Sequence, residues 1–187
     1  MGEVRKRMVE GAAQLLARRG LPGTSFAEIL ELTGAPRGSV YHHFPDGKDQ
    51  LVGSAVDLAG TQLVDALNRK AGAPAEEITE HFLHIWHSVL TRSHCEAGCA
   101  VLAVTVATDS PELMNHAVTV FRTWRGRLTE LLELGGLTPL HATQFATTLI
   151  ASVEGAVVLS RAEQNTEPFD TVAKQLLDQI RRMVTTP

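Results

Sequence analysis

The sequence has few cysteines and little net charge, and both shortages narrow what the chain can be. Its 187 residues include two cysteines, too few for the disulfide framework of a small secreted domain. The formal net charge is −4, which does not by itself indicate a protein that binds nucleic acid. No charged and apolar leader of a signal peptide opens the chain, and we therefore expect a cytoplasmic protein with reduced thiols.

Familiar catalytic motifs and a membrane-spanning run are also missing. The patterns G-x-S-x-G, G-x-x-x-x-G-K-[ST], H-E-x-x-H and G-x-G-x-x-G do not occur, so we expect no enzyme and no cofactor. The most apolar stretch, 142–159, contains Gln144, Glu154 and several Thr and Ser. These polar residues favour a helix buried inside protein over one that crosses a membrane.

The most informative stretch is 25–44, which predicts two short helices joined by a tight turn. Ser25 and Glu28 have the S-x-x-E spacing of a capping box, in which each side chain satisfies a backbone N–H of the first turn. Gly34 can adopt the left-handed conformation that ends a helix. Pro36 has no N–H to donate and therefore suits the start of the next helix.

The second of these helices has two different faces. Val40 and Phe44 are four residues apart and are predicted to face the core together. The side chains left facing outward are Arg37, Ser39, Tyr41, His42 and His43. A two-helix unit whose second helix carries hydrogen-bonding and cationic side chains is the arrangement that contacts bases in the major groove.

The run Gly34-Ala-Pro-Arg-Gly-Ser-Val-Tyr-His-His-Phe44, followed by Lys48 and Leu51, resembles the helix-turn-helix of TetR-family transcriptional regulators. Those proteins usually show Gly-Val-Ser-Lys-Gly-Thr-Leu-Tyr-x-His-Phe and then Lys-x-x-Leu. This chain departs from that pattern with Pro36, Arg37 and Ser39 in place of Ser, Lys and Thr. The resemblance implies a helix-turn-helix DNA-binding domain over 1–47 and a helical ligand-binding and dimerisation domain over 48–187.

The charge distribution fits such a division. Residues 1–50 hold seven Lys or Arg against six Asp or Glu, a net of +1, which leaves −5 for the remainder. A nearly neutral head with a few placed cations suits binding that depends on local geometry. In addition, Cys99 after Gly98 resembles the Gly-Cys-Pro that opens a helix in the LmrA/YxaF-like subgroup of the family, with Ala100 in place of the proline.

The fold class predicted for the whole chain is all-α, with a three-helix head followed by a helical body. Apolar residues at helical spacing predict further helices over 3–19, 48–69, 75–91, 97–108, 111–133, 139–161 and 169–184. The helix 48–69 is the continuous element between head and body. For the segment 101–106, a strand is the alternative that periodicity alone leaves open.

The last two predicted helices, 139–161 and 169–184, carry more apolar surface than a small body can cover. The first of them is rich in small residues, which let helices approach closely. A two-fold four-helix bundle would bury both, and the resemblance implies the same homodimer. The alternative is that both helices form the core of a single protomer. A dimer would place two recognition helices about 34 Å apart, the spacing of successive major grooves.

The predicted body helices carry aromatic and aliphatic residues that describe a cavity for a small hydrophobic effector. These candidate ligand-binding residues are Phe82, Trp86, Leu102, Val106, Phe121, Trp124 and Phe145. For any one of them, plain core packing is the alternative. The resemblance to ligand-responsive regulators favours the cavity for the group as a whole.

A second group of residues offers possible metal ligands. It comprises His81, His84, His87, His94, Cys95 and Cys99. Such side chains bind zinc or copper, but neither a paired C-x-x-C nor a spaced His framework accompanies them. We therefore expect no metal site, and a helical metal-binding or small-molecule-binding protein or enzyme without DNA binding is the alternative to a regulator.

The predicted function is a ligand-responsive, homodimeric, DNA-binding transcriptional repressor of a palindromic operator. Arg37 is expected to make two hydrogen bonds to a guanine edge, with His42 near the adjacent bases. Gly38 lets the helix backbone approach the DNA. The residues expected to contact phosphates are Ser25, Ser39, Tyr41, His43 and Lys48.

Overall fold

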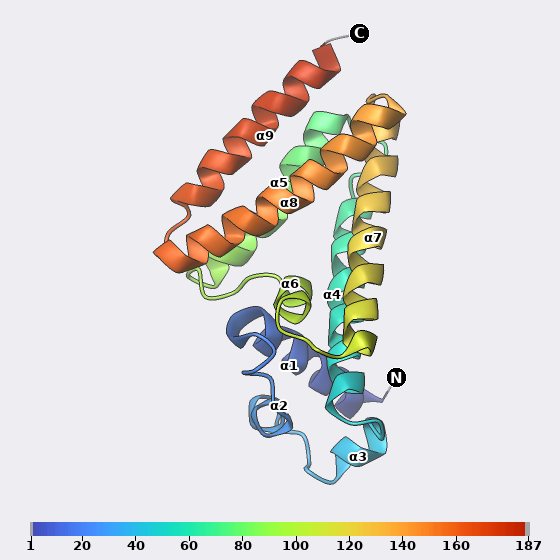
Figure 1. The fold of residues 1–187 in the computed structure, drawn as a ribbon, viewed down its shortest axis with the longest axis vertical. Coiled ribbons are helices and arrows are strands. Elements are labelled where there is room, and N and C mark those ends of the chain that lie inside the picture. The colour runs from blue at the N-terminus through green and yellow to red at the C-terminus, as the bar shows by residue number, and fades with distance from the viewer. Residues whose placement is uncertain (1, 186–187) are drawn as a thin grey trace. The chain divides into compact units, whose positions relative to one another are not determined.

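The structure, a computed structural model, describes residues 2–185, and over that range it contains nine α-helices and no strand. The helices are α1 (Glu3–Arg19), α2 (Phe26–Thr33), α3 (Ser39–His43), α4 (Lys48–Asn68), α5 (Ala75–Arg92), α6 (Ala100–Thr105), α7 (Pro111–Leu134), α8 (Pro139–Glu163) and α9 (Glu167–Thr185) (Figure 1). The predicted all-α fold is confirmed, and so is the absence of a strand at 101–106.

The helices divide between two compact units. The first unit holds the chain up to Gln62 together with Cys99–Phe121. The second unit holds Leu63–Gly98 and the chain from Arg122 onward. One boundary between the units, after Gln62, falls inside α4, and another, after Phe121, falls inside α7. Each of these two helices therefore contributes one part to each unit.

In the first unit, α1 crosses α2 at very short range. A Cβ atom built on Gly11 would lie 2.4 Å from Cγ2 of Thr33. Thr33 is itself held in place, because its Oγ1 donates a hydrogen bond to the Ile29 carbonyl at 2.7 Å. The crossing therefore requires glycine. The buried core of this head contains the predicted residues Leu15, Leu16, Ile29, Val40 and Phe44.

The parts of α4 and α7 that belong to the first unit also pack closely. A Cβ on Gly53 would lie 2.8 Å from the His116 ring, and one on Gly60 would lie 2.8 Å from a Val120 methyl. Beside them, His116 Nδ1 lies 2.8 Å from Asp57 Oδ1. Two glycines seven residues apart thus let the two helices lie side by side at this end.

The second unit is built on α5, α8 and α9, which contact one another. Buried large side chains fill the space between them, among them Phe82, Leu90, Phe145, Leu149, Phe169 and Ile180. The buried Ser160 hydroxyl at the end of α8 accepts a hydrogen bond from the Phe169 N–H at 3.1 Å. This bond fixes the turn between the last two helices.

The helix predicted over 97–108 is shorter than expected. It begins at Ala100 and ends at Thr105. Cys99 has an extended backbone, and its Sγ accepts a hydrogen bond from the Leu102 N–H at 3.3 Å, so it caps the helix. Before it, Gly98 packs so closely that a Cβ would lie 3.1 Å from Arg161 Cδ. Small apolar residues satisfy the helical period, but periodicity does not reveal that Cys99 takes the capping position, which leaves Ala97–Cys99 outside the helix.

The apolar helix predicted over 139–161 is α8, which extends to Glu163. By length and composition it is the one helix among the described residues that could cross a membrane. Half of its most apolar 18-residue window is buried inside the protein. A core helix passes the same test, and the burial favours that interpretation.

Candidate nucleic-acid interface

The first helix of the two-helix stretch, α2, begins with the predicted capping box. Ser25 Oγ accepts a hydrogen bond from the Glu28 N–H at 3.3 Å, and Glu28 Oε2 accepts one from the Ser25 N–H at 3.1 Å. The Ser25 backbone N–H, and after it the Ser25 hydroxyl, lower the pKa of Glu28 below its ordinary value. The stabilisation from this carboxylate is therefore complete above its ordinary pKa and is lost as the pH falls through the lowered one.

Ser25 is also one of the residues predicted to contact phosphate. Its single hydroxyl proton is donated to Glu28 Oε2 at 3.0 Å, and its backbone N–H is used by the same carboxylate. A phosphate contact by Ser25 would therefore have to take a proton from the cap. The phosphate contact stays a prediction, and making it would require Ser25 to give up its hydroxyl hydrogen bond to Glu28.

The turn between the two helices ends α2 as predicted but starts α3 later than predicted. Gly34 has φ 63° and ψ 19°, and its N–H donates to the Leu30 carbonyl. Pro36 is not the first residue of the next helix. Its carbonyl instead accepts hydrogen bonds from the Ser39 N–H at 3.0 Å and the Ser39 hydroxyl at 2.6 Å. These bonds form a turn that leaves α3 only five residues long.

The faces of α3 lie as the sequence predicts. Val40 is 3% exposed and Phe44 is fully buried. On the opposite side Tyr41 is 78% exposed, and Arg37 and His42 are exposed as well. Ser39 and His43 are half-buried, and the His43 ring lies 5.0 Å from the His42 ring. The side chains available for base or phosphate contact therefore come from the outward face of one short helix and the turn before it.

Gly38 precedes α3 with φ −66° and ψ −18°, a conformation that any residue adopts. A Cβ atom built there would have no neighbour within 4 Å. The fold therefore does not require glycine at this position, unlike Gly34 with its positive φ. An open backbone at the start of α3 suits a close approach by a molecule outside the chain.

Two cations near the head have contacts that the sequence did not predict. Lys48 Nζ donates a hydrogen bond to the Leu21 carbonyl at 3.2 Å, which links the start of α4 to the turn after α1. Arg5 lies over the Phe44 ring with its Cζ 5.1 Å from the ring centroid, and it donates to Ser54 Oγ at 3.1 Å. Arg5 is thus part of the head's packing. No spacing signal marks these pairs, because their members are tens of residues apart.

Four of the predicted effector-binding residues lie in the second unit. Phe82 and Trp86 are on α5, Trp124 is on α7 and Phe145 is on α8. All four are at most 7% exposed. The rings of Trp86 and Trp124 meet edge to face with centroids 6.4 Å apart. These residues form part of an aromatic core, and their role in binding a ligand stays a prediction.

The other three predicted effector-binding residues belong to the first unit. Leu102 on α6 and Phe121 on α7 are half-buried. Val106, the C-cap residue of α6, is 74% exposed and so adds little to the core of its unit. Their part in an effector site is likewise untested.

Several of the His and Cys residues considered as metal ligands have other contacts. His81 Nε2 lies 2.9 Å from the Ala66 carbonyl, and His87 Nε2 lies 3.4 Å from Asp170 Oδ1. Both cysteines are free thiols and buried. Within residues 2–185, no three His, Cys, Asp or Glu side chains gather as a metal site would need.

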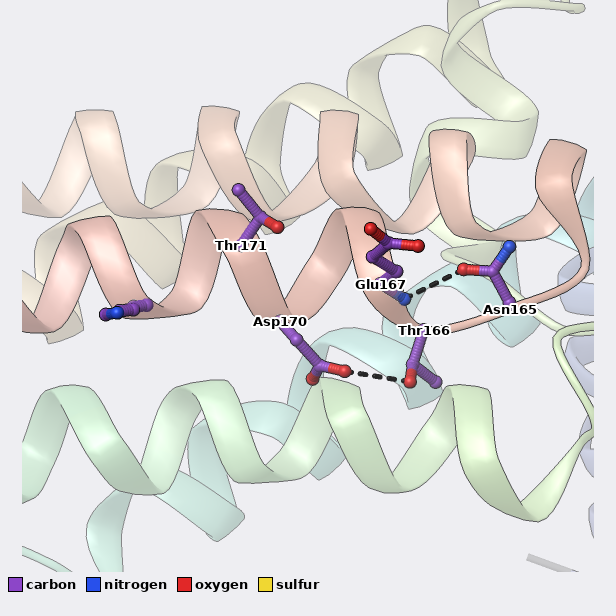
Figure 2. A pocket seen from close by; sticks show the side chains of 6 residues that line it. Asn165, Thr166, Glu167, Asp170 and Thr171 are labelled. Carbon is purple, nitrogen blue, oxygen red and sulfur yellow. Dashed lines mark hydrogen bonds between the residues drawn. The ribbon is translucent and has the colours of Figure 1, made fainter.

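An open hollow on the second unit lies at the start of α9 (Figure 2). Its lining residues are Asn165, Thr166, Glu167, Asp170, Thr171 and Lys174. Asn165 Oδ1 accepts a hydrogen bond from the Glu167 N–H, and Thr166 Oγ1 donates to Asp170 Oδ2, each at 2.9 Å. These bonds cap α9, which starts at Glu167, two residues earlier than predicted. The capping accounts for three of the polar side chains of the hollow, those of Asn165, Thr166 and Asp170.

A capped α2, a glycine turn and a short α3 with an exposed outer face, set in an all-helical chain, define the class of helix-turn-helix DNA-binding transcriptional regulators. The model of the family described as bacterial regulatory proteins, tetR family, matches residues 8–55. A model described as transcriptional regulator LmrA/YxaF-like, C-terminal domain, matches residues 74–175. The chain belongs to the TetR family and has an LmrA/YxaF-like C-terminal domain.

Individual relatives align with this chain over nearly its whole length. An uncharacterized HTH-type transcriptional regulator of Mycobacterium tuberculosis is 32% identical over 179 residues, covering 92% of this chain and 91% of that protein. The HTH-type transcriptional repressor DhaR of a Mycobacterium species is 26% identical over 179 residues, covering 89% and 87%. The crystal structure of a TetR transcriptional regulator from Chloroflexus aurantiacus superposes with a TM-score of 0.78 at 26% identity, covering 97% and 96%. The family and these relatives are transcriptional regulators, not enzymes.

Proposed function

We propose that this TetR-family regulator is a homodimeric, cytoplasmic repressor that leaves a palindromic operator when a small hydrophobic effector binds. The observation that carries the DNA-binding part is the exposed side of α3 and of the turn before it. Tyr41 and His42 on α3 and Arg37 in the turn are exposed, and none of them belongs to the buried core of the head. Exposed side chains outside the core are available for a partner. The functional division at residue 47, between a reading head and a regulatory body, is part of the proposal.

Within the operator, Arg37 makes two hydrogen bonds to the O6 and N7 atoms of a guanine, because its planar fork fits that edge. His42 lies near the bases beside it, and Gly38 brings the start of α3 close to the DNA. The contacts to phosphates, which fix the register, come from Ser25, Ser39, Tyr41, His43 and Lys48. No described side chain forms a hydrogen bond or an ion pair with Arg37, so its guanidinium is available.

The homodimer forms through α8 and α9. A groove between them is lined on the α8 side by Ala151, Gly155 and Leu159 and on the α9 side by Thr171, Val172 and Gln175. The exposed residues of α8 between Ala142 and Ser160 are uncharged, and Val158 and Leu159 are about half exposed. A long helix with a small, uncharged outer face suits close packing against a second copy. Such a dimer presents two α3 helices to successive major grooves.

The effector site lies in the aromatic core of the second unit, around Phe82, Trp86, Trp124 and Phe145. Their burial excludes water and favours an apolar ligand. Its binding favours a state in which the two heads no longer match adjacent grooves. Both α4 and α7 belong partly to each unit, which supports them as the elements that carry the change.

Repression follows from occupancy, because a dimer bound across a promoter excludes polymerase from it. The relative named DhaR is a repressor, which supports the same sign of regulation here. The test is a gel shift with the DNA that flanks the chain's own gene, repeated with a panel of hydrophobic compounds. We expect a discrete protein–DNA complex, and we expect at least one compound to dissociate it. A complex that no compound releases would contradict effector-controlled repression, and no complex at all would contradict the operator.

A further inference from the structure

The second unit contains a buried hydrogen-bond donor that no described residue accepts. Trp86 is 7% exposed, and its Nε1 atom is inaccessible and makes no hydrogen bond within the described chain. Nearly all buried polar groups in folded proteins are paired, because an unpaired donor has lost its water without replacement. This indole N–H therefore calls for an acceptor from outside the chain.

Packing alone does not explain why this residue is tryptophan. The rings of Trp86 and Trp124 pack edge to face, with their centroids 6.4 Å apart. That contact and the apolar burial need an aromatic ring but not an N–H group. A phenylalanine would keep most of the contact and leave no polar atom unsatisfied. The N–H is the feature that a ligand could use.

We propose that Trp86 Nε1 donates a hydrogen bond to an oxygen acceptor on the effector, and that this acceptor is uncharged. The proposal rests on the effector site proposed above and names the chemistry that the site selects. The effector is then an apolar molecule with a carbonyl or ether oxygen. A pure hydrocarbon of the same shape would leave the indole N–H unpaired.

The acceptor is uncharged because none of the buried side chains of the described second unit carries a positive charge. The buried polar and charged side chains of the described second unit are Thr79, Ser93, Glu154 and Ser160, and none of them is cationic. The three hydroxyls donate to or accept from backbone groups of their own unit. A carboxylate ligand would have to be buried without a counter-charge, which disfavours it strongly.

The test uses the full-length protein and matched pairs of probes that differ only in the acceptor. The pairs are benzophenone with diphenylmethane and 9-fluorenone with fluorene. The chain has two tryptophans, so a ¹H–¹⁵N spectrum shows two indole N–H signals, and the W124F variant identifies that of Trp86. We expect at least one ketone to move the Trp86 signal downfield. The matching hydrocarbon should leave the signal at its position in the ligand-free protein. If no ketone shifts that signal, the proposal is overturned.

Variants then measure the contribution of the donor. We expect the wild-type protein to bind that ketone about tenfold more tightly than its hydrocarbon, the ratio that one such hydrogen bond supplies. The W86F variant should lose this preference and bind the ketone and its hydrocarbon about equally. Equal preferences in W86F and wild type would contradict the proposal. Should W86F not fold, the wild-type spectrum alone decides.

Operator binding separates this proposal from the proposed function. W86F is expected to shift the flanking DNA as the wild type does, because α3 is unchanged. The wild-type protein could bind the flanking DNA and be released from it equally well by ketones and by their hydrocarbons. That result would support the proposed function and contradict the role of Trp86. If a trapped water satisfies the indole, the signal is already downfield without a ligand and no probe moves it, which also overturns the proposal.

Discussion

Arg37 lies in the turn before α3, exposed and two residues ahead of the first helical residue. This position places a guanidinium at the N-terminal end of the helix, where helix-turn-helix proteins contact bases. The neighbouring Gly38 has neither a required conformation nor a close neighbour. At the scale of single residues, the exposure of Arg37 and the open surrounding of Gly38 support the proposal that these two positions contact DNA.

The first prediction concerns base specificity. Arg37→Ala should lower affinity for the operator by about 1–3 kcal/mol and relax the preference at one base pair, because the two hydrogen bonds to guanine are removed. Binding to a set of operators with single-base changes measures both effects. Arg69→Ala, which removes an exposed arginine outside the head, is the control and should leave the preference intact. A uniform decrease on every sequence would make Arg37 a phosphate-binding residue instead.

The second prediction separates two roles of Lys48, which bonds the Leu21 carbonyl and is proposed to meet a phosphate. Lys48→Gln keeps a donor for the carbonyl but removes the charge. The slope of log affinity against log salt should fall by about 0.9 for each phosphate that a protomer no longer neutralises. Anisotropy titrations at several salt concentrations measure it. Unchanged slope with lower thermal stability would leave Lys48 only its structural bond.

At the scale of elements, the crossing of α1 and α2 depends on Gly11. Gly11→Ala brings a methyl group to 2.4 Å from Thr33 Cγ2, and turning Thr33 away would break its bond to the Ile29 carbonyl. We expect the substitution to destabilise the first unit by about 1–3 kcal/mol, the usual effect of overpacking. Urea unfolding followed by circular dichroism measures the free energy of unfolding.

The matched control for this crossing is Gly126→Ala on α7. A Cβ atom there would have no neighbour within 4 Å, and the residue lies inside a helix. The control should stabilise the protein by about 0.5–1 kcal/mol, because alanine loses less backbone entropy than glycine. Equal effects at positions 11 and 126 would show that the close approach of α1 and α2 is not real.

The elements also show what the sequence could and could not predict. The ends of α2 followed from Ser25, Glu28 and Gly34, because capping residues act locally. The start of α6 did not, because Cys99 is an extended N-cap residue whose Sγ accepts a hydrogen bond from the Leu102 N–H, a role that apolar periodicity does not reveal. At the site, the outward face of α3 was predictable from its period. The bond from Lys48 to Leu21 and the placement of Arg5 over Phe44 were not, because they depend on tertiary proximity.

At the scale of the whole molecule, the proposed function requires two protomers. Gly155→Arg places a charge in the groove between α8 and α9, and we expect the dimer to dissociate and operator affinity to fall with it. Sedimentation equilibrium measures the mass. Ala71→Arg, at an exposed turn outside the groove, is the control and should remain dimeric. A dimer that survives Gly155→Arg would place the interface elsewhere.

The central claim is that two copies of α3 bind one duplex together. Sedimentation of the protein with a fluorescent duplex taken from beside its own gene, at low ionic strength, tests it most directly. We expect two protomers per duplex and protection of two half-sites about 10 base pairs apart, centre to centre. A single protomer without affinity for any duplex under these conditions would contradict it.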